Sequence, residues 1–380
     1  MKQKKYIFLA IITILVLPSK TSSALKKLEY LSHGLPEGVK IYKYRSDDRR
    51  AVLYVAEMDR RYYPSLKFRT SVARGRVLGR ATVSDIVRQA TRNGKNILVA
   101  INASFGILGG TYEGVIDNLH IQNGMLISPP NHHACFGVTK TGEFLMGNLK
   151  MNISINIAGK EIRVSGLNRE RDRNSSLMLY TPRFGRSTKT NGGCEVVLSG
   201  VSIPLTPGYK SRFTVNEVRN SGDTPIPRDS FVLSAPKGSG VAKFLANLNL
   251  GDTGKLSVSL SPQNWNEVVE GIGGNCWLVK HGKIYKTANK GRRATKDDPR
   301  TALGYNDKKL FLMVVDGRQS GYSNGMSYRD VASAMIKLGA TEAINLDGGG
   351  SSTFVVNGKL INRPSGGKER HVLNAVFITN

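Results

Sequence analysis

Two aspartates stand directly after apolar runs in the C-terminal third of the chain. Asp316 follows the β-branched run 310–315, and Asp347 follows the short apolar run 343–346. Both runs are typical of buried strands, and the segment 327–338 between them has helical periodicity. Two carboxylates in one site could split a glycosidic bond, one stabilising the oxocarbenium-like centre while the other handles a water proton. We therefore take Asp316 and Asp347 as the candidate catalytic residues.

The order strand 310–315, helix 327–338, strand 343–346 predicts a βαβ unit, whose two strands run parallel. Because parallel strands end at the same edge of a sheet, we expect both aspartates on one side. Turn formation is the alternative role for each Asp-Gly pair, since this pair is common turn chemistry. The predicted fold class is α+β: a mixed sheet core containing this unit, with several antiparallel hairpins around it.

Groups that could hold an anion lie close to the two aspartates in sequence. Arginine makes planar, bidentate contacts to phosphate, and the backbone amides of a glycine-rich turn could form an anion-binding nest. An asparagine also ends the buried run 96–101, which adds it to the same cleft. The candidate substrate-binding residues are Asn102, Arg300, Arg318, Gly348, Gly349, Gly350, Ser351 and Ser352, and Asp298, Arg370 and His371 form a second tier.

The sequence predicts no cofactor. The adjacent pair His132 and His133, with Cys135 nearby, has no second cluster that would complete a tetrahedral zinc site. No metal ligands are therefore assigned, although a divalent metal is not excluded. Three cysteines permit at most one disulfide, whose pairing the sequence leaves open.

The N-terminus has the pattern of an export signal. Three lysines precede an apolar run over residues 6–17, and small residues at 22–24 form a cleavage site. Residues 1–24 are therefore predicted to be a signal peptide, and the mature protein to be secreted, periplasmic or on the cell surface. That apolar run is too short to span a bilayer, so no transmembrane segment is expected in the mature chain.

The chain is strongly basic. Its formal net charge is +27, and removal of the four lysines of the signal leaves 27 − 4 = +23. Such a field attracts polyanions, so the predicted partner is a phosphate-containing glycan or another polyanion, with no specific nucleic acid. A solubilising basic loop at 283–296 is the alternative origin of the charge.

We expect residues 25–80 to form an N-terminal β layer of the same fold and 81–380 to form the main domain. The oligomeric state is left open.

Several motifs together resemble the phosphodiester glycosidase family. They are YTPRFGRSTKT, GDTPIPRDSFVLS, DDPRTALGYN, VVDGR, NLDGGGSST and ERHVLNAVFI, and the resemblance spans 96–380. It implies an α+β fold and N-acetylglucosaminidase-like hydrolysis of a bond between a sugar C1 and a phosphodiester. Residues 103–104 and 275–277 depart from the family pattern, and these departures concern sugar specificity. Two rival functions are a secreted phosphodiesterase or nuclease, and a noncatalytic binder of anionic cell-wall polymer.

Overall fold

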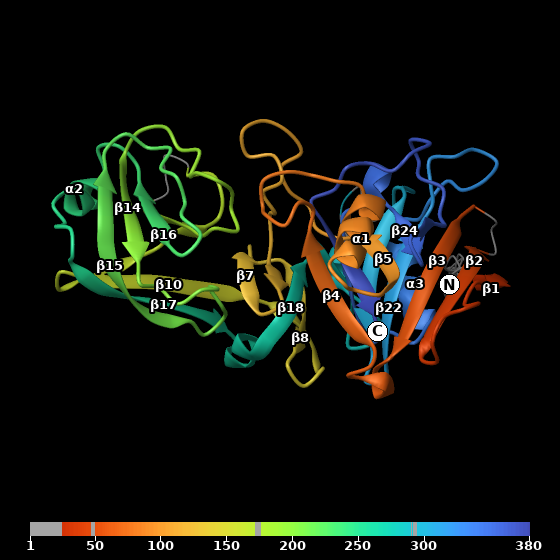
Figure 1. Cartoon of the computed structure of the whole chain (residues 1–380). Helices are drawn as coiled ribbons and strands as arrows, with labels where there is room; N and C mark the ends of the chain where they lie inside the picture. Colours follow the sequence, from red (N-terminus) through yellow and green to blue (C-terminus); the bar gives the residue numbers. More distant parts are fainter. Residues whose placement is uncertain (1–24, 47–49, 172–175, 290, 292–294) are drawn as a thin grey trace, which may run out of the picture.

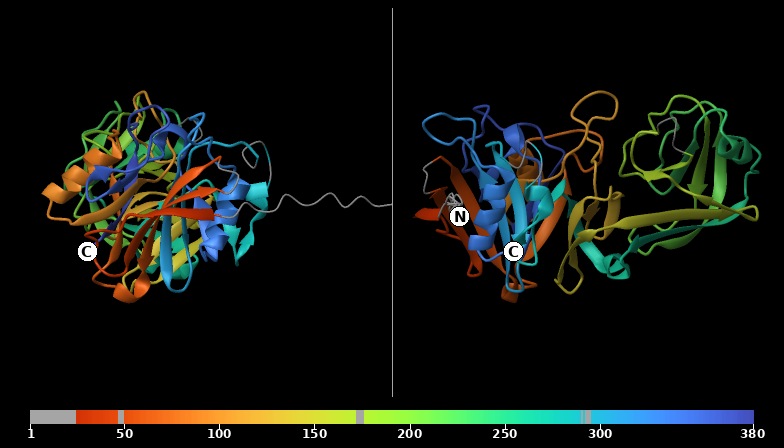
Figure 2. Two further views of the ribbon diagram at one scale, coloured as in Figure 1. Left: turned by 90° about the vertical axis from the view of Figure 1, so that its right-hand side faces the viewer. Right: turned by 180° about the vertical axis from the view of Figure 1, so that it is seen from behind.

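The computed structural model describes residues 25–46, 50–171, 176–289, 291 and 295–380, so the predicted signal peptide lies outside it. The described chain forms two lobes joined by a small sheet (Figure 1). The first lobe contains both the N-terminal strands and the C-terminal third of the chain, and the second contains the middle. The view from behind shows the same division (Figure 2). All residues predicted for the site belong to the first lobe.

An eight-stranded sheet forms the centre of the first lobe. Every pairing in it is antiparallel. Its strands, in spatial order, are β1 (Leu25–Tyr30), β2 (Val39–Ser46), β3 (Val52–Asp59), β22 (Lys309–Val315), β21 (Arg300–Tyr305), β23 (Glu342–Asn345), β19 (Cys276–Lys280) and β20 (Lys283–Ile284). The residues predicted as an N-terminal layer thus contribute three strands to the sheet that holds β22.

The prediction of an α+β fold with a βαβ core is wrong, because the chain is mostly β and contains only three α-helices in its described part. The two strands and the helix exist at nearly the predicted positions, as β22, α3 (Tyr328–Lys337) and β23. However, β21 lies between β22 and β23 and pairs antiparallel with both. The two outer strands therefore still run in the same direction and end at the same edge, although they are not neighbours.

A second sheet packs against one face of the first. It contains β25 (Lys359–Leu360), β24 (Phe354–Val356), β5 (Ile97–Asn102), β26 (Asn374–Thr379) and β4 (Lys67–Val72). Alternate residues of β22 explain the layering, because Leu312 and Val314 pack toward this sheet whereas Met313 and Val315 pack toward α3. The helix α1 (Val83–Arg92), capped by Thr82, covers the outer face of the second sheet.

The second lobe is built on another eight-stranded sheet and has its own apolar core. Its strands are β11 (Lys160–Arg163), β10 (Lys150–Ile157), β17 (Thr253–Ser261), β15 (Lys210–Arg219), β14 (Cys194–Ser199), β16 (Phe231–Ala235), β13 (Met178–Tyr180) and β12 (Gly166–Leu167), with the helix α2 (Gly240–Ala246) beside them. The joining sheet contains β7 (Met125–Ser128), β6 (His120–Gln122), β18 (Val268–Gly273), β8 (Ala134–Thr139) and β9 (Phe144–Asn148). Its side chains enter the cores of both lobes.

Candidate functional site

The strand register places both predicted aspartates at one edge of the central sheet. Arg300 pairs with Val315, the residue before Asp316. On the other side of β21, the amide of Leu346 donates to the carbonyl of Thr301, which aligns Asp347 with Arg300. The two aspartates are thus separated by one intervening strand, which corresponds to about 10 Å between their backbones. The two aspartates lie at the same edge because β22 and β23 both pair antiparallel with β21. They are not neighbouring parallel strands, as the βαβ prediction required.

Asp316 is engaged by the protein itself. Its side chain is almost completely buried and accepts hydrogen bonds from the Tyr322 hydroxyl at 3.0 Å and the Asn362 amide at 2.9 Å. The backbone amide of Arg363 donates to both carboxylate oxygens, at 3.2 and 3.1 Å. Burial raises the pKa of Asp316, and these hydrogen bonds offset part of that increase. This pattern is typical of a carboxylate that holds two segments of chain together.

Asp347 has a different environment. Its side chain is half-buried, and burial raises its pKa to about 6. A hydrogen bond from Ser351 and the positive charge of Arg370 oppose the increase, whereas the charge of Asp117 adds to it. A carboxyl group with a pKa near neutrality can both take up and release a proton under working conditions. Asp347 is therefore the stronger candidate for proton transfer.

The turn after Asp347 is a short 3-10 turn at Gly349–Ser351. Most of its amides are already bonded: Gly349 donates to the Pro299 carbonyl at 2.8 Å, and the amides of Ser351 and Ser352 close the turn on Gly348 and Gly349. These three amides are used within the fold, and the anion nest suggested by the sequence stays a prediction. The glycines are required for close approach, because a β-carbon on Gly350 would lie 2.5 Å from a guanidinium nitrogen of Arg370.

Two arginines lie against this glycine turn. A β-carbon on Gly349 would lie 3.2 Å from Nη2 of Arg318, which shows how closely that guanidinium covers the turn. Arg318 has φ of 60°, an uncommon conformation for a residue with a side chain. Its Nε donates to Asp298 at 3.0 Å, so Asp298 holds the guanidinium in place. The exposed Arg370 brings positive charge to Asp347 itself, while Arg318 lies two residues further along the turn, against Gly349.

Three other predicted residues mainly join segments of the fold. The fully buried side chain of Asn102 donates to the Asp347 carbonyl at 2.5 Å and accepts from Thr301 and from the Thr353 amide. Arg300 is 6 % exposed, donates to the Met326 carbonyl and lies over the Tyr328 ring. Ser352 receives a hydrogen bond from Thr301. The remaining residue, His371, is exposed, and its carbonyl accepts from Arg80.

Two residues near Asp347 were missed by the sequence analysis. The backbone amide of Asp347 donates to the carbonyl of Ala103, and the backbone amide of Asp117 donates to the carbonyl of Phe105. Both aspartates are thus attached to the segment 103–105. Partial burial raises the pKa of Asp117, and the charge of Arg169 lowers it. Arg169 itself has two buried nitrogens, Nε and Nη2, without a hydrogen-bond partner in the described chain. A carboxylate and an unsatisfied guanidinium therefore join the site from loops distant in sequence.

The described residues contain no cluster of three or more histidine, cysteine or acidic side chains suited to a metal ion. Cys135 and Cys194 are buried free thiols. Within the same residues, no helix is both long and apolar enough to cross a bilayer.

Comparison with known proteins supports the resemblance found in the motifs. Residues 210–379 match the model of the phosphodiester glycosidase family. N-acetylglucosamine-1-phosphodiester alpha-N-acetylglucosaminidase of Bos taurus is 35% identical over 127 residues, covering 30% of this chain and 24% of the bovine protein. A prophage-derived protein of Bacillus subtilis is 41% identical over 106 residues, or 27% of this chain and 16% of that protein. The chain thus matches about a quarter or less of the length of these relatives.

Solved structures share the fold over most of the chain. A protein from Synechocystis superposes with a TM-score of 0.72 at 19% identity, covering 94% of this chain and 64% of that one. A protein from Burkholderia pseudomallei gives a TM-score of 0.68 at 21% identity, covering 87% and 74%. At these identities the likeness establishes the architecture alone. The sequence comparisons and several of the motifs agree that residues 210–379 of this chain are similar to the phosphodiester glycosidase family.

Proposed function

We propose that the protein hydrolyses the bond between a sugar C1 and a phosphodiester oxygen, releasing a free sugar and a phosphomonoester. The observation that carries the proposal is Asp347: a half-buried carboxyl with a pKa raised to about 6, at a strand end inside the region that matches the family. The Bos taurus relative is named for this type of bond, with N-acetylglucosamine as the sugar.

The proposed reaction breaks the C1–O bond of the substrate. Water adds to C1 and gives up a proton to a carboxylate, while the bonding electrons leave with the phosphate oxygen. That oxygen is weakly basic, so its departure needs little help from an acid. We assign the water proton to Asp347, and we assign the stabilisation of positive charge at C1 to Asp117, whose charge is close enough to act on Asp347.

The departing phosphate needs positive charge and hydrogen-bond donors. Arg318 and Arg370 lie against the glycine turn beside Asp347, and Arg169 contributes two buried donors that no described residue satisfies. A buried guanidinium without a partner is costly unless an anion binds to it. Arg300 and Asn102 act as positioning residues, because their side chains are already committed to protein partners. Asp316 is likewise assigned a positioning role.

The natural substrate is proposed to be a phosphate-containing glycan outside the cytoplasm. The basic net charge favours a polyanionic substrate, and the predicted signal at residues 1–24 favours export.

The test is incubation of the purified protein with a panel of chromogenic glycosyl-1-phosphodiesters, including the N-acetylglucosamine compound. Free sugar and phosphomonoester in equal amounts are the expected products. Release of nucleotides from DNA, with no sugar released from any member of the panel, would replace the proposal with a nuclease. Binding of anionic wall polymer without turnover of any compound would replace it with a binding protein.

A further inference from the structure

The outward face of the second-lobe sheet carries cations without acidic partners. Arg212 of β15 and Lys255 of β17 are directly opposite each other in the strand register, so their β-carbons are about 5 Å apart. Like charges in this arrangement destabilise a sheet. No described acidic group forms an ion pair with either residue, or with Lys210 two positions before Arg212.

Some other basic residues of the described chain are paired with an acid. Arg61, Arg88 and Lys309 each lie within 2.7 Å of an aspartate or glutamate. In the row of residues that lie opposite one another across the strands, Arg212 is followed by Lys255, Asn156 and Glu161. The acid Glu161 is therefore separated from Lys255 by the strand that carries Asn156. The repulsion between Arg212 and Lys255 is thus left for a bound anion to neutralise.

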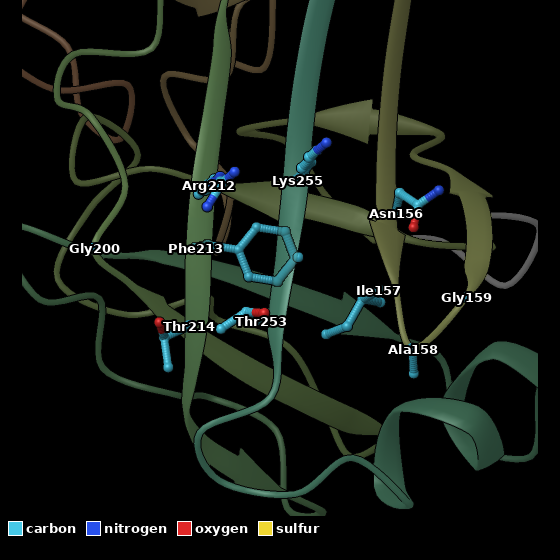
Figure 3. A pocket seen from close by; sticks show the side chains of 11 residues that line it. Asn156, Ile157, Ala158, Gly159, Gly200, Arg212, Phe213, Thr214, Thr253 and Lys255 are labelled. Carbon is cyan, nitrogen blue, oxygen red and sulfur yellow. The ribbon is translucent and has the colours of Figure 1, made fainter.

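The same cations line two hollows. One has a volume of about 460 Å³ and the other about 390 Å³, and both are bordered by Asn156, Arg212 and Lys255. Figure 3 shows the side chains of these three residues in the first hollow, with Thr214 and Thr253 below them. Lys210 borders the second hollow. Because the two hollows are adjacent and share their cations, they can hold successive negative charges along one linear polymer.

The rest of this face provides hydroxyl and amide groups. Register pairs join Ser154 with Ser257 and Asn152 with Ser259, so short polar side chains form rows across β10 and β17. The outward positions of β11, β10, β17 and β15 carry no aromatic residue: they are Glu161, Arg163, Lys150, Asn152, Ser154, Asn156, Thr253, Lys255, Ser257, Ser259, Ser261, Lys210, Arg212, Thr214 and Asn216. Single-stranded nucleic acids are usually held by stacking on aromatic rings. The aromatic residue that borders the first hollow, Phe213, is 2 % exposed and belongs to the core of the lobe, so its ring is not available for stacking.

From these observations we infer that the outward face of β11, β10, β17 and β15 binds a linear phosphodiester polymer without bases, such as a polyol phosphate. Arginine and lysine contact its phosphates, and the serine and asparagine rows contact its hydroxyl groups. The face belongs to the lobe that does not contain Asp347 (Figure 1). The inference therefore stands whether or not Asp347 is catalytic.

The test compares two double variants of the full mature chain. Arg212→Ser with Lys255→Ser removes the opposed cations from the face. Arg228→Ser with Lys237→Ser removes two exposed charges from loops of the same lobe and serves as the matched control. Binding of poly(glycerol phosphate) is measured by calorimetry between about 50 and 200 mM salt, with oligo(dT) and neutral dextran as comparison probes.

The first variant is expected to bind poly(glycerol phosphate) at least about tenfold more weakly at low salt, with a log–log salt slope shallower by ~1 to 2. The control variant should keep the affinity of the unmodified protein to within about twofold, the size expected of distant screened charges. Equal loss in both variants would overturn the inference, because it would show that net charge alone drives binding. Equally tight binding of oligo(dT), lost in the same variant, would overturn it in favour of a nucleic-acid surface.

Turnover of a small chromogenic phosphodiester separates this inference from the proposed function. The Arg212 and Lys255 variant is expected to hydrolyse it at an unchanged rate while losing the polymer. If no phosphodiester is hydrolysed by any form of the protein, the binding comparison still decides the inference.

Discussion

An aspartate follows each of β22 and β23 at the same edge of the sheet, yet the surroundings of the two aspartates differ. Asp316 is buried and bonded to Tyr322, Asn362 and Arg363, whereas Asp347 is half-buried beside a glycine turn and two guanidinium groups. Burial raises both pKa values, but only Asp347 remains accessible enough to meet a substrate. An Asp-Gly after a strand can thus be an anchor or a reactive group, and the difference depends on what the rest of the chain places around it.

The sharpest way to break this comparison is to neutralise Asp347. Asp347→Asn is expected to reduce kcat/KM on a chromogenic glycosyl phosphodiester by at least ~10³-fold, because the amide cannot accept the proton of the attacking water. The thermal unfolding midpoint should remain equal to or above that of the unmodified protein, since the substitution removes a partly buried charge. Activity within a few-fold of normal would exclude Asp347 from the chemistry.

The pH dependence provides the next largest effect. If ionised Asp347 is the base, kcat/KM should fall tenfold per unit below about pH 6, the value to which burial raises its pKa. Stability should follow the opposite trend. The raised pKa means that the folded state binds more protons than the unfolded state, so this group favours folding at low pH and loses that contribution as the pH rises through about 6. Chemical denaturation of the protein and of Asp347→Asn, across this range, measures the difference.

Neutralising Asp316 should give the reverse pattern. Asp316→Asn places an NH₂ group where donors from Asn362 and Arg363 now converge. The free energy of unfolding is expected to fall by about 2 to 3 kcal/mol, because buried charge-assisted hydrogen bonds are lost. At a temperature where the variant is folded, activity should decrease less than in Asp347→Asn. Normal stability with complete loss of activity would instead make Asp316 a catalytic residue.

The smallest expected effect concerns the turn itself. Gly349→Ala introduces a β-carbon at φ of 62° and 3.2 Å from Arg318, which should lower the free energy of unfolding by about 1 to 2 kcal/mol. It should also raise KM, because Arg318 must move. Gly366→Ala is the matched control, as no atom lies within 4 Å of its β-carbon. Equal behaviour of the two variants would show that the turn does not position Arg318.

Local structure was predictable because it depends on nearby residues. The caps of two helices are visible in the sequence as Ser or Thr three residues before Asp. The structure has both of them: Thr82 caps α1, and Ser327 and Asp330 form a capping box at α3. The hairpin of β21 and β22 likewise depends on nearby residues, because the polar pair at 306–307 stands between two apolar runs. The position of β21 between β22 and β23 was not predictable, because periodicity shows that a strand is buried but does not show which strands lie beside it.

The candidate site was only partly predictable for the same reason. Asp347 and the glycine turn follow one another in the chain, and their motif is visible in the sequence. Asp117 and Arg169 come from loops more than 170 residues earlier. The tertiary fold brings the charge of Asp117 to act on Asp347, and the charge of Arg169 to act on Asp117. One signal could have suggested Asp117, since it follows an apolar pair after the glycine-rich segment 105–114. That Nε and Nη2 of Arg169 have no hydrogen-bond partner among the described residues could be found only in the structure.

The alternation of β21 limits which changes its hairpin can tolerate. Neighbouring residues serve opposite layers: Arg300 reaches Met326 and the Tyr328 ring on the helix side, while Thr301 reaches Asn102 and Ser352 on the other. An insertion of one residue near the turn at 306–307 would shift the strand by one position and exchange these faces. A guanidinium would then meet the fully buried amide of Asn102. Homologous sequences should therefore vary the residues of this turn while keeping its length.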